Sequence, residues 1–126
     1  MIIGQTHSKT ITVQEKDTAR VLGSGGLDVF GTPAMIALME NVCLEMVRPS
    51  LPTGSDTVGI EINAKHIKAS PVGASITCTA TITAIDGRKI TFNIEAKDAS
   101  NSTIGAAIHE RFIIDCEKFM TRLSQK

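Results

Sequence analysis

Three residues of different chemical type stand out in the segment from Phe30 to Gly73. Thr32 supplies a hydroxyl, Glu40 a carboxylate and His66 an imidazole. A hydroxyl that orients or attacks, a carboxylate that exchanges protons and an imidazole that titrates near neutrality are the groups that acyl transfer requires. Because little else in the chain has chemical character, these three residues form the candidate catalytic set.

The hydroxyl and the carboxylate lie at opposite ends of one predicted helix. Residues 33–48 are apolar around nearly the whole helical circumference, so the helix is expected to be buried on most sides. Thr32 is expected to be its N-cap, and Pro33 suits the first turn. A carboxylate is rarely buried in such a helix without a partner or a function, which makes Glu40 the anomaly. Capping alone would explain Thr32, and a solvent-facing position would explain Glu40.

The spacing of these two residues constrains any shared role. Thr32 and Glu40 are eight residues apart, which is about 12 Å along a helix. Their side chains cannot meet within one straight helix. Either Thr32 folds back from the helix or the site combines residues of two subunits, and we favour a site at a dimer interface.

The remaining segments predict a sheet around that helix. Alternation of apolar and polar residues, with Asp86-Gly87 as a hairpin turn, predicts strands at 6–13, 57–68, 74–85, 88–97 and 103–114. The last four are expected to form a meander, residues 14–31 a long glycine-rich connection, and the segment CEKFMTRLSQK a short helix or tail. A curved antiparallel sheet wrapped around a single apolar helix would bury the apolar surface of that helix. We therefore expect one α+β domain over residues 1–126.

Composition excludes several classes of function. Thirteen basic and thirteen acidic residues give no net charge, and four Phe with no Trp or Tyr leave few stacking surfaces, so no nucleic-acid partner is expected. Cys43, Cys78 and Cys116 show no C-x-x-C spacing, which argues against a metal site. The odd cysteine count and an N-terminus without a signal-like apolar core predict a cytoplasmic protein. No apolar run approaches the ~20 residues that span a membrane.

Several pieces of the sequence, in order, resemble the fluoroacetyl-CoA thioesterase family of hotdog-fold proteins: FGTPAMIALME, NAKHIKASPVG, DGRKITFNIEAKD, IGAAIHERFII and CEKF. The resemblance runs from about residue 6 to the C-terminus. It implies a hotdog fold, a homodimer, and hydrolysis of a small acyl-CoA to free acid and CoA, with coenzyme A as part of the substrate and no metal. It matches the catalytic threonine, glutamate and histidine of the family to Thr32, Glu40 and His66.

The same resemblance suggests where substrate contacts lie and which acyl group is favoured. Candidate substrate-binding residues are Phe30, Gly31, Pro33, Gly59 and Arg111; for Arg111 the alternative is a structural polar pairing inside His109-Glu110-Arg111. The fluoroacetyl-specific enzyme carries lid phenylalanines before its threonine. Here that segment is VLGSGGLDVF, which predicts a more open or mobile entrance and a broader or different acyl group.

Other functions remain open at this level. A dehydratase or hydratase of the same fold would act on acyl thioesters with a histidine and an acidic residue. A non-catalytic acyl-CoA-binding module would use the same pocket as a receptor. For His66, an ordinary core or interface histidine is the structural alternative, and Cys43 is expected to be inert because it lies among apolar residues.

Overall fold

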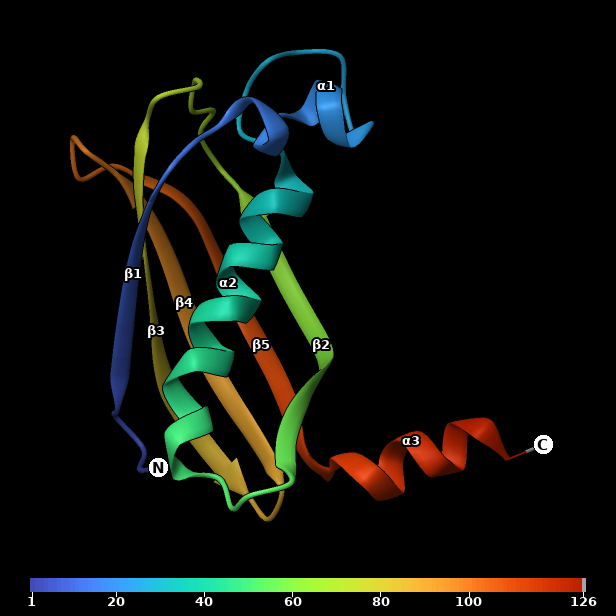
Figure 1. Cartoon of the computed structure of the whole chain (residues 1–126). Helices are drawn as coiled ribbons and strands as arrows, with labels where there is room; N and C mark the ends of the chain where they lie inside the picture. The colour runs from blue at the N-terminus through green and yellow to red at the C-terminus, as the bar shows by residue number, and fades with distance from the viewer. Residues whose placement is uncertain (126) are drawn as a thin grey trace.

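A curved antiparallel sheet wraps around one long helix in the computed structural model, which describes residues 1–125 (Figure 1). The helix is α2 (Thr32–Val47), and the strands are β1 (Thr6–Thr12), β2 (Ser55–His66), β3 (Ser75–Asp86), β4 (Lys89–Asp98) and β5 (Thr103–Asp115). The α+β arrangement is the one that the sequence predicts. Among the described residues, no helix is both long and apolar enough to cross a membrane.

The order of the strands corrects one expectation. The sheet runs β1-β3-β4-β5-β2, so only β3, β4 and β5 form a meander. β2 pairs with β5 at one edge, and β1 pairs with β3 over its full length at the other. Alternation shows which face of a strand is apolar but not which strand lies beside it. The consequence is that β2 has one free edge.

The core lies between α2 and the inner face of the sheet. One side of α2 is fully buried through Met35, Met39, Val42, Cys43 and Val47. The sheet contributes a matching layer of buried side chains: Ile76, Cys78, Ile82, Ile90, Phe92 and Ile104. The helix is less enclosed than expected, because Ile36, Glu40 and Leu44 are only partly buried in the single chain.

The connection before α2 is ordered rather than structureless. It contains the 3-10 turn η1 (Glu15–Asp17) and the short helix α1 (Ala19–Leu22), which ends at Gly23 with φ 76°. The Thr18 hydroxyl accepts from the Val21 N–H, and Thr18 also forms a β-bridge with Phe30. This segment, residues 15–29, covers the N-terminal end of α2 and is called the cover segment below.

Two short elements complete the chain. The 3-10 turn η2 (Arg48–Ser50) follows α2, and α3 (Cys116–Ser124) follows β5. Asp115 caps α3 by accepting from the Lys118 N–H at 2.9 Å. The C-terminal segment is therefore a helix over these residues, and it projects away from the sheet beyond β2 (Figure 1).

Close packing of α2 on β5 predicts a stability effect at Gly105. A Cβ there would lie 2.5 Å from the Met35 Sδ and 3.0 Å from the Lys65 carbonyl oxygen. Gly105→Ala should therefore lower the free energy of unfolding by about 1–3 kcal/mol, measured by urea denaturation. Gly26→Ala is the matched control, because its Cβ meets nothing within 4 Å. Equal stability of the two variants would contradict this packing.

Candidate active site

Thr32 and His66 meet at the N-terminal end of α2. The Thr32 Oγ1 lies 2.9 Å from the His66 Nδ1, within hydrogen-bonding distance. α2 begins at Thr32 itself and its N-cap is Gly31, so the expectation that Thr32 caps the helix is wrong. Helix ends commonly shift by a residue, and here the shift leaves the threonine hydroxyl free to bond the imidazole.

The helix N-terminus supplies further polar groups at this point. The first N–H groups of a helix have no intrahelical acceptor, and Pro33 has no N–H at all. The Met35 N–H donates to the Gly31 carbonyl at 3.0 Å, which leaves the N–H groups of Thr32 and Ala34 available. These groups lie at the positive end of the helix dipole and can accept a developing oxyanion.

A pocket of about 270 Å³ opens at the same place. Phe30, Gly31, Thr32 and His66 line it, together with Ala19 and Ser24 from the cover segment and Ile67, Lys68 and Ala69. Phe30 is 2% exposed, and its ring meets that of His66 edge-on at 6.2 Å. Gly31 is needed because a Cβ would lie 3.0 Å from the Leu22 side chain and 3.1 Å from the Ala19 nitrogen.

His66 is kept neutral in this environment. Burial lowers the pKa of His66 below its usual value of 6.5, because desolvation disfavours the imidazolium. Its Nε2 is buried and has no hydrogen-bond partner among the described residues. In the tautomer with hydrogen on Nε2, the Thr32 hydroxyl donates to Nδ1 and the Nε2–H remains free. A buried N–H without a partner calls for a ligand or water beside it.

Glu40 lies in a separate polar cluster further along α2. Its Oε2 is 3.7 Å from an Arg111 guanidinium nitrogen and 3.9 Å from the His109 Nε2. The carboxylate side chain is 40% exposed in the single chain. The structure therefore brings Thr32 and His66 together and leaves Glu40 about 12 Å away along the helix.

A buried network holds Arg111 beneath Glu40. Arg111 is 6% exposed and donates to the Thr57 Oγ1 at 2.8 Å and the Thr57 carbonyl at 2.9 Å. The His109 Nδ1–H donates to the Glu61 carbonyl at 2.7 Å, so its Nε2 accepts from Arg111 at 3.2 Å. Burial lowers the pKa of His109, and Arg111 reinforces this effect. The cation that attracts the Glu40 carboxylate is therefore Arg111.

Gly59 allows the carboxylate to reach the sheet. A Cβ at residue 59 would lie 2.7 Å from the Glu40 Oε2 and 3.2 Å from the His109 ring. The pairing of β2 with β5 also shifts between Gly59 and Glu61, which marks a β-bulge at this point. The bulge and the missing side chain together leave room for Glu40 at the inner face of β2.

Comparison with known proteins settles the family. The family model described as fluoroacetyl-CoA-specific thioesterase, FlK, matches residues 13–117. The fluoroacetyl-CoA thioesterase of Streptantibioticus cattleyicolor is 35% identical over 99 residues, which are 79% of this chain and 70% of that protein. The chain belongs to the fluoroacetyl-CoA-specific thioesterase family. This confirms the resemblance inferred from the sequence, and with it the class of enzyme, a thioester hydrolase acting on acyl-CoA.

Solved structures confirm the hotdog fold. A crystal structure of the fluoroacetyl-CoA thioesterase FlK superposes with a TM-score of 0.93 at 31% identity, covering 100% of this chain and 97% of that one. A variant of FlK in complex with fluoroacetate and CoA has a TM-score of 0.90 at 31% identity, covering 94% and 99%. A thioesterase superfamily member from Thermus thermophilus, at 21% identity, has a TM-score of 0.89 over 97% and 90% and supports the fold alone.

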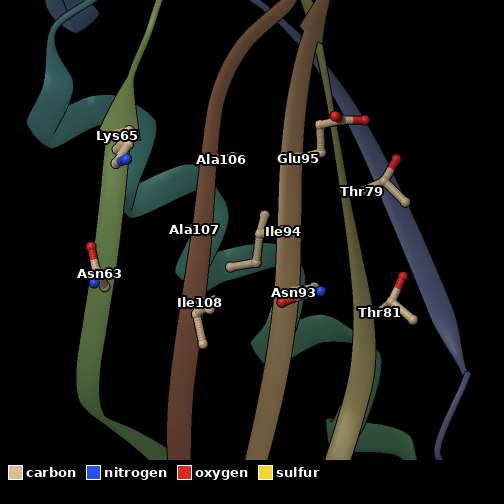
Figure 2. Close-up of a pocket in the computed structure, with 10 residues that line it drawn as sticks. All are labelled: Asn63, Lys65, Thr79, Thr81, Asn93, Ile94, Glu95, Ala106, Ala107 and Ile108. Atoms are coloured by element: carbon tan, nitrogen blue, oxygen red, sulfur yellow. The ribbon is translucent and has the colours of Figure 1, made fainter.

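Within this thioesterase-family fold, a larger hollow lies on the opposite face of the sheet. It measures about 600 Å³, and its lining includes Asn63, Lys65, Thr79, Asn93 and Glu95. Figure 2 shows these side chains on β2, β3, β4 and β5, with α2 behind the sheet. Neither Thr32 nor His66 lines it, so the smaller pocket at the helix N-terminus is the better candidate site.

The candidate residues from the sequence divide into two groups in space. Phe30, Gly31, Thr32 and His66 line one pocket, and Pro33 lies directly beside it in α2. Gly59 and Arg111 accompany Glu40 in the other cluster. Arg111 is too buried to reach CoA phosphates, so the structural pairing is the better description of it.

Sequence reasoning missed two members of the Glu40 cluster. Thr57 had no distinguishing signal, because threonine is common in strands. His109 belongs to the polar tripeptide His109-Glu110-Arg111, but its contact with Glu40 depends on how β5 packs against α2. Among the described residues no metal-binding group of His, Cys, Asp or Glu occurs. Burial raises the pKa of the Cys43 thiol to about 12, which makes it a poor nucleophile.

The environment of His66 predicts its titration. Because burial lowers the pKa, the ring should titrate with a midpoint below 6.5, followed by NMR of the imidazole carbons as a function of pH. The folded state then binds fewer protons than the unfolded state below pH 6.5, so the His66 contribution to stability falls as the pH drops through that range. A midpoint at or above 6.5 would contradict the buried, neutral imidazole.

Proposed function

We propose that this protein is an acyl-CoA thioesterase that hydrolyses a small acyl-CoA to the free acid and CoA, using Thr32, Glu40 and His66. Family membership gives the reaction class. The observation that carries the assignment of residues is the Thr32–His66 contact at the start of α2. It sets a hydroxyl, a neutral imidazole and free backbone N–H groups around one pocket. Coenzyme A takes part only as a portion of the substrate, and no metal is required.

The proposed active unit is a homodimer formed through β2. This strand pairs only with β5, and an unpaired strand edge is a template for pairing with another chain. Ile60 in this strand and Ile67 directly after it are 51% and 61% exposed. Most small oligomers are twofold dimers whose interface joins the same surface of both copies. Antiparallel pairing of β2 with its symmetry mate would join the two sheets into one.

This dimer would bring the Thr32–His66 pocket of one copy next to the Glu40 cluster of the other. A twofold axis that crosses β2 at Ile62 or Asn63, midway between Gly59 and His66, puts the His66 end of one copy beside the Gly59 end of the other. Glu40 of the partner subunit, held at its own Gly59, then approaches the Thr32–His66 pocket. The partly exposed Glu40 would be covered by the same contact.

In this mechanism the α2 N-terminus binds the thioester carbonyl. The N–H groups of Thr32 and Ala34 donate to the carbonyl oxygen and stabilise the oxyanion of the tetrahedral intermediate. The Thr32 hydroxyl holds the imidazole in the tautomer that carries its hydrogen on Nε2. The Nε2–H of His66 can then donate a hydrogen bond to the departing sulfur, while the proton of the CoA thiol comes from the water molecule that the reaction consumes.

Glu40 supplies or activates the nucleophile. In one route its carboxylate attacks the carbonyl carbon, the C–S bond breaks, and water hydrolyses the resulting mixed anhydride. In the other it takes a proton from a water molecule whose oxygen attacks the same carbon. Both routes consume one water and yield the free acid and the thiol. The Arg111 guanidinium, 3.7 Å from the Glu40 Oε2, would hold the carboxylate in place for either route.

The pocket supports a short acyl group. Its volume of about 270 Å³ is at the lower end for ligand sites. Phe30 packs against His66, and no other phenylalanine lines this pocket. The cover segment instead contributes Ala19, Ser24 and Val29 to the lining. We therefore propose a broader or different acyl preference than the fluoroacetyl-CoA of the curated relative.

The proposal includes a cytoplasmic location. All three cysteines, Cys43, Cys78 and Cys116, are free thiols, and two of them are buried. Reduced thiols are typical of proteins in a reducing compartment. Acyl-CoA substrates are consistent with the same location.

Removal of the carboxylate charge tests the mechanism. Glu40→Gln should lower kcat by about 10²–10⁴-fold and leave the fold intact, because the amide can neither attack nor take a proton. The assay is thiol release from short, branched and aromatic acyl-CoAs, checked by circular dichroism for folding. It also separates hydrolysis from hydration, since a hydratase releases no thiol.

Glu45→Gln is the control for this substitution. Glu45 lies on the same helix but pairs with Lys9 at 3.1 Å, away from the proposed site. This variant should keep near-parental kcat. A Glu40→Gln enzyme with near-parental kcat on every acyl-CoA that the parent cleaves would rule out the proposed role.

A further inference from the structure

His109 is a buried titratable side chain that takes no part in the proposed mechanism. It lies on the inner face of β5 and is 1% exposed. Its ring stacks on that of Phe92 in β4, with the ring centres 6.1 Å apart and the planes at 28°. An apolar side chain would fill this space without the cost of burying two polar nitrogens. A histidine here therefore indicates a use for its nitrogens.

The hydrogen bonds of His109 determine which nitrogen carries the hydrogen. Nδ1 lies 2.7 Å from the Glu61 carbonyl oxygen, at the β-bulge of β2. A carbonyl oxygen can only accept, so Nδ1 carries the hydrogen and Nε2 presents a lone pair. Burial lowers the pKa of His109, which keeps Nε2 unprotonated. Nε2 therefore accepts from the Arg111 Nη1, which lies 3.2 Å away.

The Arg111 guanidinium is held by an acceptor at each of its three nitrogens. Nε and Nη2 donate to the Thr57 hydroxyl and carbonyl at 2.8 and 2.9 Å, and Nη1 donates to His109. All three acceptors are uncharged. Because the guanidinium is planar and rigid, these bonds fix its position and its orientation. His109 is the acceptor for Nη1, the nitrogen that lies 3.7 Å from the Glu40 Oε2.

The three groups face the space left by the missing side chain of Gly59. A Cβ there would lie 2.7 Å from the Glu40 Oε2, 3.2 Å from the His109 Cε1 and 3.4 Å from the Arg111 Nη1. The separation of 3.7 Å between Nη1 and the carboxylate is longer than a hydrogen bond. Arg111 is therefore close enough to attract the Glu40 carboxylate but does not bond it directly.

We propose that His109 is a positioning residue for thioester hydrolysis, a role that rests on the proposed function of Glu40. By accepting from Nη1, His109 holds the Arg111 guanidinium beside the carboxylate and keeps it from closing into a direct ion pair. A two-bond pair of arginine and carboxylate would occupy both carboxylate oxygens. With Nη1 bonded to His109, an oxygen of Glu40 stays available to attack or to take a proton. His109 acts through Arg111 and not on the substrate.

Two amide substitutions separate this role from a purely structural one. The side-chain oxygen of His109→Gln can take the place of Nε2 and accept from Arg111. The shorter side chain of His109→Asn can replace only the Nδ1–H that donates to Glu61. His109→Asn should lower kcat for thiol release about tenfold or more, with KM within about twofold of the parental value. His109→Gln should restore most of the parental kcat.

His7→Asn is the matched control for these variants. His7 is a partly exposed histidine of β1 that contacts Glu45, away from the proposed site. This substitution should leave kcat unchanged. Equal kcat in the His109→Asn and His109→Gln variants, whether both high or both low, would overturn the positioning role.

NMR without substrate separates this inference from the proposed function. The ring nitrogens of His109 should show a hydrogen on Nδ1 and none on Nε2. The Arg111 guanidinium hydrogens should exchange slowly with solvent in the parent and in His109→Gln, and about tenfold faster in His109→Asn. If the parent hydrolyses no thioester, the proposed function fails while these spectra still decide the contact. A hydrogen on Nε2, or equal exchange in all three proteins, would refute it.

Discussion

The stiffness of α2 is the constraint on which the rest of the structure depends. A straight helix holds Thr32 and Glu40 about 12 Å apart, so one chain cannot direct both at the same carbonyl. The helix is fixed in place by a core of methionines and aliphatic side chains against the sheet. Thr32 consequently meets His66 at one end of β2, and Glu40 meets Gly59 near the other. The proposed pairing of a second copy through β2 would join them.

The two halves of the proposed site differ in their electrostatics. Around His66, burial keeps the imidazole neutral, so that its Nε2–H can donate a hydrogen bond to the departing sulfur. Beside Glu40, the buried Arg111 places a positive charge 3.7 Å from the carboxylate oxygen. Burial lowers the pKa of His109, and the neighbouring Arg111 charge lowers it further, so this ring stays neutral and accepts from Arg111. The proposed site therefore combines a neutral imidazole from one cluster with a carboxylate beside an arginine from the other.

Much of this architecture could be predicted from the sequence, for physical reasons. The apolar circumference of residues 33–48 predicts the central helix, and strict alternation in residues 74–97 predicts the hairpin of β3 and β4. The position of β2 at the far edge could not be predicted, because alternation carries no information about neighbouring strands. The N-cap is Gly31, one residue before the Thr32 that the sequence predicts, since glycine and threonine both suit that position.

The candidate site was predictable as a set of residue types but not as a geometry. Chemical type singled out Thr32, Glu40 and His66, and the family resemblance gave them roles. The Arg111 network with Thr57 and His109 depends on packing between β2, β5 and α2, which no local pattern reveals.

The shared site is tested most directly by mixing two inactive variants. Thr32→Ala and Glu40→Gln subunits are each expected to form inactive dimers, but a mixed dimer would contain one complete site. Unfolding and refolding the two variants together at equal ratio should restore about one quarter of the parental kcat, measured by thiol release, as expected for random twofold pairing. If the mixture stays as inactive as the separate variants, Thr32 and Glu40 do not act across a subunit interface.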